Sequence, residues 1–157
     1  MTIVVYYSMN GNTKEAAEKI AAGIGADLLE LRPAKPLPEE GGKKYAIGGM
    51  QAMFGMCPAI EKSSIDFSRY ERIILGCPVW AGKCAPYINT FLKGKDVNLL
   101  VKSVFTCSGG GDNDSCIADL KKRLPNLGST LALADRANGL ASQNKEKLEE
   151  YIKKELA

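Results

Sequence analysis

The sequence contains no histidine among its 157 residues. This absence excludes Ser-His and Cys-His nucleophilic catalysis, general-base catalysis by imidazole near neutral pH, and every zinc or iron site with histidine ligands. Any chemistry must therefore depend on carboxylates, thiols, the backbone or a bound cofactor. We expect no metal site and no catalytic side chain.

The chain also has little excess charge and no long hydrophobic run. Its 21 basic and 18 acidic residues give a net charge of +3, which is too small for a dedicated nucleic-acid-binding protein. No apolar stretch approaches the length that spans a bilayer, and the N-terminus lacks the pattern of a signal peptide. The length predicts a single domain over residues 1–157. We expect a cytoplasmic protein with no nucleic-acid or membrane partner.

Hydrophobic runs and amphipathic stripes alternate along the chain. Five short apolar or β-branched runs predict buried strands, at residues 3–7, 27–31, 72–77, 102–107 and 129–134. Apolar residues at helical spacing predict helices, at residues 16–24, 87–92, 116–124 and 148–156. Strands that alternate with helices form parallel sheets through right-handed crossovers. We therefore expect an α/β fold, a doubly wound open sheet with helices on both faces.

Residues 32–69 fit this alternation least well. The segment begins with several prolines and glycines and continues with apolar residues at helical spacing, interrupted by Gly48 and Gly49. One interpretation is a crossover helix with a long lead-in that uses methionine to fill the core. The alternative is a methionine-rich lid over a bound ligand, formed by residues 45–57.

Ligands of an open parallel sheet bind beyond the carboxyl ends of its strands. The loop after the first strand, Ser8-Met9-Asn10-Gly11-Asn12-Thr13, runs directly into a predicted helix. Free backbone N–H groups and the positive end of the helix dipole suit a phosphate group, with hydroxyl donors from Ser8 and Thr13. The alternative is an ordinary helix cap, because Asn and Thr favour that position.

Two more loops follow the third and fourth predicted strands. Residues 77–83 contain the only tryptophan, Trp80; a large aromatic side chain at this edge suggests a flat apolar ligand. Alternatively, Trp80 packs on its own loop. Residues 107–114 contain three consecutive glycines, which let the backbone approach a ligand closely. The alternative for this loop is a flexible turn.

Two nucleotide-binding motifs are missing. No G-x-G-x-x-G follows the first strand, which disfavours a dinucleotide site. Residues 76–84 imitate a P-loop, but they have one residue too many between the glycines. They also have Cys84 where a magnesium-binding Ser or Thr belongs. Hydrolysis of nucleoside triphosphates is therefore not predicted.

With these three loops in order, the sequence resembles the flavodoxin family over essentially its whole length. Residues 8–13 look like the family's FMN phosphate loop, residues 76–80 like its first flavin loop and residues 106–112 like its second. The resemblance implies a five-stranded parallel sheet in the order 2-1-3-4-5, non-covalently bound FMN and redox partner proteins. The flavin contacts that it implies are Ser8, Met9, Asn10, Gly11, Asn12, Thr13, Pro78, Val79, Trp80, Ala81, Gly82, Cys107, Ser108, Gly109, Gly110, Gly111 and Asp112.

Three features depart from the family's pattern. The isoelectric point is near 8.5, whereas many flavodoxins are strongly acidic. Residues 108–114 contain no aromatic side chain to cover the second flavin face, so that face is either open or covered by the methionine-rich segment. Ala81 separates Trp80 from Gly82, so the redox-linked peptide flip of the family is not assigned.

The five cysteines show no C-x-x-C spacing, which argues against a zinc knuckle or a thioredoxin-like site. Four of them bracket the two flavin loops, namely Cys77, Cys84, Cys107 and Cys116. We interpret them as buried reduced thiols that act as small hydrophobic residues. The alternative is a thiol pair that exchanges electrons with a flavin.

Three functional hypotheses follow from the loops and the resemblance. The leading one is a one-domain FMN electron carrier, in which the flavin supplies the redox chemistry and the protein tunes it. The second is an FMN-dependent NAD(P)H:quinone-type reductase, favoured by the missing second aromatic, because hydride transfer needs an exposed flavin face. The third is a non-redox module that binds a phosphate ligand or a partner protein.

Overall fold

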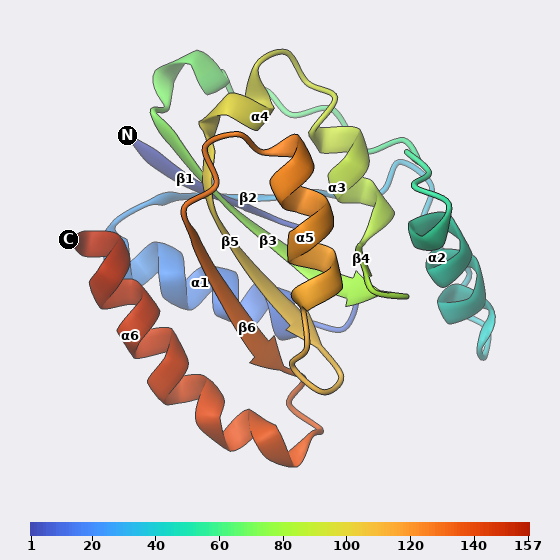
Figure 1. The fold of residues 1–157 in the computed structure, drawn as a ribbon. Helices are drawn as coiled ribbons and strands as arrows, with labels where there is room; N and C mark the ends of the chain where they lie inside the picture. The colour runs from blue at the N-terminus through green and yellow to red at the C-terminus, as the bar shows by residue number, and fades with distance from the viewer.

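Five parallel strands form the centre of the structure, a computed structural model that describes all residues 1–157 (Figure 1). Their order is β2-β1-β3-β5-β6, with β1 Thr2–Tyr6, β2 Asp27–Glu30, β3 Arg72–Trp80, β5 Val101–Ser108 and β6 Ser129–Ala134. A sixth strand, β4 (Lys83–Cys84), pairs antiparallel with the end of β3. With β4 set aside, the parallel strands have the order 2-1-3-4-5, so the predicted sheet is confirmed.

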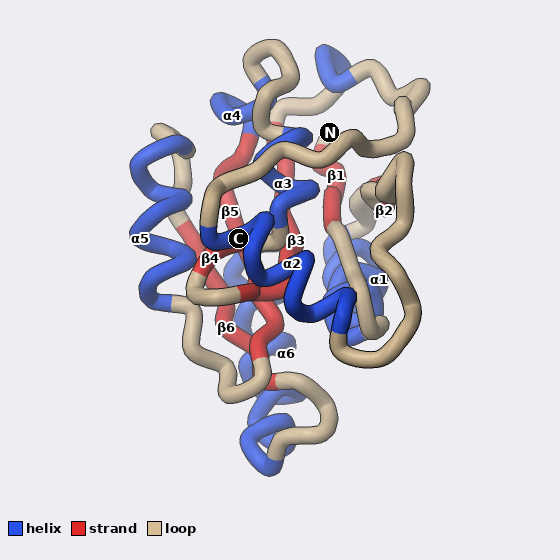
Figure 2. Tube along the Cα trace, turned by 90° about the vertical axis from the view of Figure 1, so that its right-hand side faces the viewer, coloured by secondary structure: helices blue, strands red, loops and turns tan.

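Helices cover both faces of this sheet, as expected. One face carries α1 (Asn12–Ile24) and α6 (Asn144–Leu156). The other carries α3 (Pro86–Phe91), α4 (Val97–Leu100) and α5 (Asp114–Arg123). Two short 3₁₀ helices, η1 (Phe67–Arg69) and η2 (Gly139–Gln143), lie in connections. The remaining helix, α2 (Lys43–Met53), lies beside β4 and α3 at the margin of the molecule (Figures 1 and 2).

Burial of consecutive residues explains why the strands are continuous hydrophobic runs. Ile3, Val4 and Val5 of β1 are each 0% exposed. Successive strand side chains point to opposite faces, so both faces of the sheet must be covered. The core accordingly divides into a cluster of 19 buried residues on the α3–α5 face and one of 13 on the α1–α6 face.

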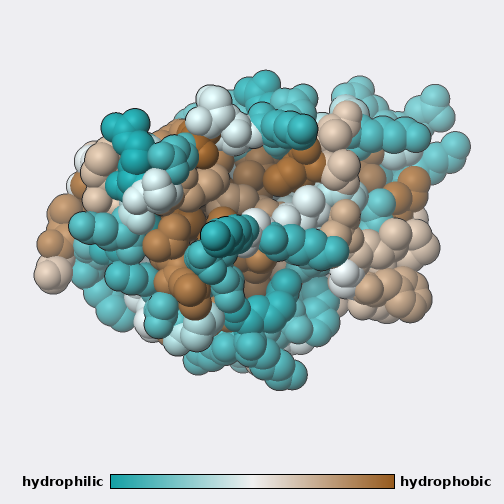
Figure 3. Space-filling view, turned by 90° about the horizontal axis from the view of Figure 1, so that it is seen from above, coloured by the Kyte–Doolittle hydropathy of each residue, from teal (hydrophilic) through white to brown (hydrophobic).

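The excursion between β2 and β3 contains a helix, but its methionines do not fill the core. Met50, Met53 and Met56 are 46%, 58% and 45% exposed, so the interpretation of methionine as core filler is wrong. Only Gly48 and Ala52 of α2 are buried, because this helix touches the protein along a narrow stripe. Apolar side chains gather at the end of the molecule where α2 lies (Figures 1 and 3).

The two ends of this excursion are fastened to each other. The Ala34 N–H donates to the Ala59 carbonyl at 2.9 Å and the Glu61 N–H to the Arg32 carbonyl at 2.8 Å. Both neighbouring strands, β2 and β3, pair with β1 rather than with the excursion. The register of the sheet is therefore set without contacts from residues 34–59.

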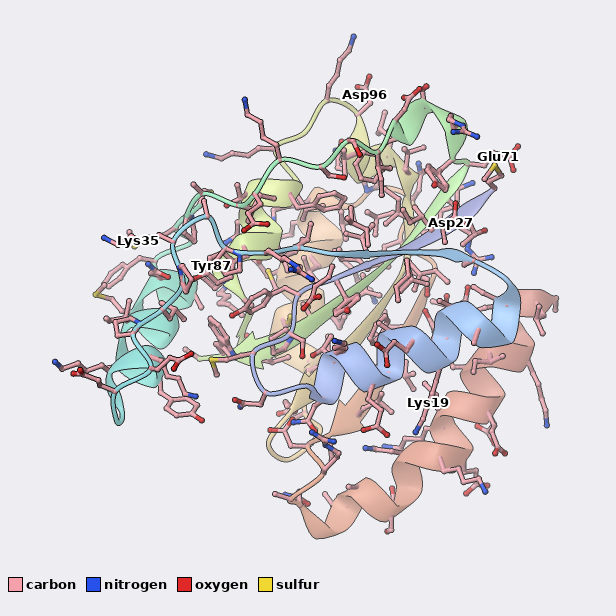
Figure 4. All side chains as sticks on the ribbon, turned by 180° about the vertical axis from the view of Figure 1, so that it is seen from behind. Lys19, Asp27, Lys35, Glu71, Tyr87 and Asp96 are labelled. Carbon is pink, nitrogen blue, oxygen red and sulfur yellow. The ribbon has the colours of Figure 1, made fainter.

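Side chains elsewhere in the molecule include both buried and solvent-directed examples. Tyr87 points inward, with its ring centroid 4.6 Å from that of Tyr7, whereas Lys19 and Lys35 point to solvent (Figure 4). No helix combines the length and the apolar composition that crossing a bilayer requires.

Candidate functional site

Three loops meet at the carboxyl ends of β1, β3 and β5, which are neighbours in the sheet. They surround a cavity of about 130 Å³. Its lining residues are Ser8, Met9, Asn10, Asn12, Thr13, Tyr45, Pro78, Val79, Trp80, Cys107, Ser108, Gly109 and Asp135. The structure thus brings together residues that lie about 100 positions apart in sequence. Adjacent parallel strands cause this, because their carboxyl ends open at the same sheet edge.

The first loop ends in a helix N-terminus that no side chain caps. Gly11 occupies the N-cap position with a φ of 89°, a left-handed conformation that favours glycine. The Gly11 N–H donates to Ser8 Oγ at 3.1 Å, which closes the turn and leaves the Ser8 hydroxyl proton free to donate. No side chain hydrogen-bonds to the first turn of α1 as a cap. The ordinary-cap alternative is therefore absent, and the N–H groups of this turn are free for an anion.

A cation that the sequence analysis did not single out supports this loop from outside. The Arg136 guanidinium donates to Asn12 Oδ1 at 3.0 Å, to the Asn10 carbonyl at 3.3 Å and to Glu15 Oε2 at 3.2 Å. Its Nη2 atom lies 3.4 Å from an ideal Cβ built on Gly11, so a side chain at that position would contact the guanidinium. Arg136 therefore fixes the loop and adds positive charge beside the helix N-terminus.

Trp80 is placed by a tight hairpin at the end of β3. Trp80 pairs with Lys83 of β4, and Ala81 and Gly82 form the turn with φ values of 49° and 74°. Positive φ at both turn positions matches the right-handed twist of the strands. The hairpin extends beyond the ends of the neighbouring strands and places the indole in the lining of the cavity.

The indole also contacts two other parts of the chain. Its ring centroid lies 5.6 Å from that of Tyr7 in an edge-to-face arrangement of 86°. An added Cβ at Gly48 would lie 2.9 Å from Trp80 Cζ3, so α2 rests directly on the indole. Trp80 therefore packs on Tyr7 and α2 as well as on its own loop, and its stacking on a flat ligand stays a prediction.

The third loop contributes an unpaired hydroxyl and open glycines. Ser108 Oγ is buried and has no hydrogen-bond partner, although it lines the cavity. Buried hydroxyls are normally paired, so this atom has capacity for a ligand. Gly109 and Gly110 have no atoms within 4 Å of an added Cβ, which leaves open space beside the cavity.

Some predicted contacts lie outside the cavity lining. Asp112 is exposed, and its Oδ1 accepts from the Asp114 N–H at 3.0 Å at the start of α5. The predicted contacts that do not line this cavity are Gly11, Ala81, Gly82, Gly110, Gly111 and Asp112. Ala81 lines a second cavity of about 190 Å³, together with Met9, Lys44, Tyr45, Gly49 and Trp80.

Two lining residues, Tyr45 and Asp135, were not among the predicted flavin contacts, although Tyr45 begins the segment 45–57 that was considered as a lid. Asp135 directly follows β6, so the rule that ligands bind at carboxyl strand ends would have found it if applied to the last strand. Tyr45 comes from α2, and no local signal places that helix beside Trp80. Loss of solvation raises the pKa of Asp135.

Burial and a hydrogen bond between two thiols shift the pKa values of the cysteines and the tyrosine around this edge. Burial raises the pKa values of Cys84 and Cys107 to about 11, so both are neutral thiols near pH 7. A hydrogen bond with Cys116 and burial raise the pKa of Cys77 well above its usual range. Burial likewise raises the pKa of Tyr7. The same hydrogen bond lowers the pKa of Cys116. All four bracketing cysteines are buried and form no disulfide, as interpreted from the sequence.

Comparison with known proteins identifies the family. The family model described as Flavodoxin matches residues 1–155. The chain belongs to the flavodoxin family. The fold, the sheet order and the loop placement agree with membership of this family.

Other flavodoxin-like structures share the whole architecture. A crystal structure of a Lactobacillus acidophilus NCFM flavoprotein in complex with FMN is 27% identical. The match covers 92% of this chain and 96% of that one, with a TM-score of 0.69. A protein of Bacteroides eggerthii DSM 20697 is 26% identical, with 95% and 96% of the two chains covered and a TM-score of 0.73.

A curated relative adds an enzyme to this set. An NAD(P)H dehydrogenase (quinone) from Syntrophus aciditrophicus (strain SB) is 28% identical over 131 residues. The match covers 74% of this flavodoxin-family chain and 63% of the relative. The chain thus spans less than two thirds of the length of that enzyme.

The site of this flavodoxin-family protein fits a flavin cofactor. It combines an uncapped helix N-terminus for an anionic group, an indole for a flat ring and the unpaired Ser108 hydroxyl as a hydrogen-bonding group. The lining contains no histidine and no acid–base pair. The side chains can bind and orient a ligand, whereas redox chemistry requires the cofactor.

Proposed function

We propose that this protein binds FMN non-covalently and transfers electrons between redox partner proteins as a single domain over residues 1–157. The uncapped N-terminus of α1 carries this proposal, because it opens into the same cavity as Trp80 and Ser108. One anion site favours FMN, since FAD would need further donors for its second phosphate.

Each loop has a separate role in the proposed complex. The first-turn N–H groups of α1, with the hydroxyls of Ser8 and Thr13, hold the phosphate. Residues 78–82 and 107–112 line the ring, and Trp80 supplies the stacking surface. The bound flavin would supply one- and two-electron chemistry, while the protein excludes water from the ring and sets the surrounding charge.

The cavity dimensions favour a movable α2. Small-molecule pockets usually measure about 300–1,000 Å³, and the main cavity measures about 130 Å³. Met9, Tyr45 and Trp80 line both it and the second cavity of about 190 Å³, so these side chains separate the two. Displacement of Tyr45 with α2 would join the cavities and admit the ring. This is the lid interpretation of residues 45–57, in which the lid covers the flavin face for which residues 108–114 supply no aromatic side chain.

The FMN proposal can be tested with the single tryptophan. FMN titrated into flavin-free protein should quench Trp80 emission strongly, with one site per chain, and denatured protein should release FMN rather than FAD. Riboflavin, which lacks the phosphate, should bind more weakly. Unchanged emission at saturation would refute stacking on Trp80, and equal affinity for FMN and riboflavin would refute the phosphate site.

The second candidate function is an FMN-dependent NAD(P)H:quinone reductase. The 28% identity to a quinone-reducing NAD(P)H dehydrogenase favours it, as does the open space beside Gly109 and Gly110. The carrier remains our first choice, because residues 34–59 offer only Lys43 and Lys44 as a basic pair for a dinucleotide's phosphates.

Steady-state oxidation of NADPH and NADH with a quinone acceptor separates the two. A carrier should turn over far below about 1 s⁻¹, the low end for ordinary enzymes. It should also pass electrons rapidly to a one-electron acceptor after chemical reduction. Turnover at or above that rate would make the protein a reductase and would leave the FMN site itself intact.

A further inference from the structure

A cavity of about 620 Å³ lies away from the candidate flavin site. It opens between the C-terminal end of α2, β4, α3 and α5, which lie next to one another (Figure 2). None of its lining residues lines either flavin-site cavity. Its volume is in the range of small-molecule pockets, about 300–1,000 Å³.

Positive charge dominates one wall of this cavity. Lys83, Lys93 and Arg123 face it with Asp119 as the only carboxylate of the lining. Lys83 Nζ lies 3.4 Å from Asp119 Oδ1, and Arg123 Nη2 lies 2.9 Å from Asp119 Oδ2. Asp119 therefore forms ion pairs with two cations, and Lys93 has no ion-pair partner, so this part of the lining carries a surplus of positive charge.

Arg123 is held firmly in this wall. Its Nη1 donates to Asn89 Oδ1 at 2.8 Å, and Asn89 is fixed in turn through Nδ2 by the Met56 carbonyl at 3.0 Å. The Arg123 Nε N–H is buried without any acceptor. A buried donor without an acceptor leaves the guanidinium incompletely compensated, which increases the attraction of this wall for an anion.

Apolar side chains make up much of the remaining lining. Ala52, Met53 and Phe54 come from the end of α2, and Leu92 follows α3. Phe54 is 71% exposed and Met53 is 58% exposed, although solvent exposure of such side chains is unfavourable. Cys84 lines the floor as a neutral thiol, because burial raises its pKa to about 11.

We propose that this cavity binds a small organic anion with an apolar body, a carboxylate, sulfonate or phosphate monoester. The acidic group pairs with Lys83, Lys93 and Arg123, and the apolar body lies against Met53 and Phe54. The two sites share no lining residue, although α2 contributes side chains to both.

A pair of matched probes tests the charge recognition. Isothermal titration calorimetry on the protein as purified should show 8-anilinonaphthalene-1-sulfonate binding at least about tenfold more tightly than neutral N-phenyl-1-naphthylamine. The double variant Lys83→Gln/Lys93→Gln should weaken the sulfonate about tenfold and leave the neutral compound unchanged. Lys102→Gln, at an exposed lysine outside the cavity, is the matched control and should change neither.

Cys57 reports where the probe binds. It lines this cavity and is the one cysteine that is not buried. Saturating sulfonate should slow its alkylation by N-ethylmaleimide, as followed by mass spectrometry. Equal affinity for the two probes, an unaffected double variant or unprotected Cys57 would each overturn the proposal.

Discussion

Replacing Gly48 with alanine tests the contact between α2 and Trp80. The new methyl carbon would lie 2.9 Å from Trp80 Cζ3 and 3.1 Å from Cε3. Ordinary carbon contacts are about 3.5–4.0 Å, so the helix or the indole must move. The indole has little room, because the Tyr7 ring lies against it at 5.6 Å.

The neighbouring residue supplies a matched control. An added Cβ at Gly49 meets nothing within 4 Å. Alanine is favoured over glycine in a helix interior by about 1 kcal/mol, and both substitutions receive this gain. Overpacking at Gly48 should cost about 1–3 kcal/mol. The two variants should therefore differ by about 1–3 kcal/mol in the free energy that holds α2 closed.

Native-state hydrogen exchange measures this free energy locally. Only Gly48 and Ala52 of α2 are buried, so the helix should open without global unfolding, and urea titrations would miss the effect. Exchange of the α2 amides should slow about fivefold in Gly49→Ala. It should be faster in Gly48→Ala than in Gly49→Ala by about five- to a hundredfold, with a red shift of Trp80 emission. Equal protection in the two variants, with unchanged emission, would refute the packing of α2 on Trp80.

Three further predictions concern the hairpin, the phosphate loop and the buried thiols. Ala81→Gly should raise the free energy of unfolding by about 1 kcal/mol in urea titrations, because Ala81 has a φ of 49°; a decrease would contradict this. Thr13→Val should weaken FMN by about 1.5–3 kcal/mol while sparing riboflavin, as measured by paired titrations; equal losses would point to a folding defect. Burial raises the pKa values of Cys84 and Cys107 to about 11 from 9.0, so the stability that they provide is complete below pH 9 and is lost as the pH rises toward 11. The free energy of unfolding should fall by about 2–3 kcal/mol per thiol. Urea titrations at pH 8 and pH 11 should show a smaller fall in the double variant Cys84→Ala/Cys107→Ala than in the parent protein, and an unchanged fall in Cys57→Ala.

The sequence predicted the sheet well because its strands are buried on both faces. A run such as Ile3-Val4-Val5 is conspicuous only for that reason. β4 and α4 escaped prediction, since two and four residues are too short to show a period. The methionines of α2 show the converse limit: helical spacing indicates an apolar face and does not say whether another element covers it.

The site was predictable where it depends on strand ends and unpredictable where it depends on packing between distant elements. Residues 8–10, 12–13, 78–80 and 107–109 all lie at or just after the ends of recognisable strands, and the structure brings them to one cavity. Arg136 lies 124 positions from Asn12, and Tyr45 reaches the cavity only because α2 docks on the indole. Neither contact leaves a local pattern, because each depends on how the chain returns to this edge.

The fastening of residues 34–59 at their base makes that segment an interchangeable cassette. Hydrogen bonds between residues 32–34 and 59–61 close it on itself, and the strands on either side take their register from β1. Insertions, deletions or grafted sequences inside it should leave the sheet unchanged while altering the walls of both cavities, since α2 contributes to each. Evolution and protein engineering can therefore vary ligand and partner selectivity by changing residues 34–59, while the sheet keeps its structure.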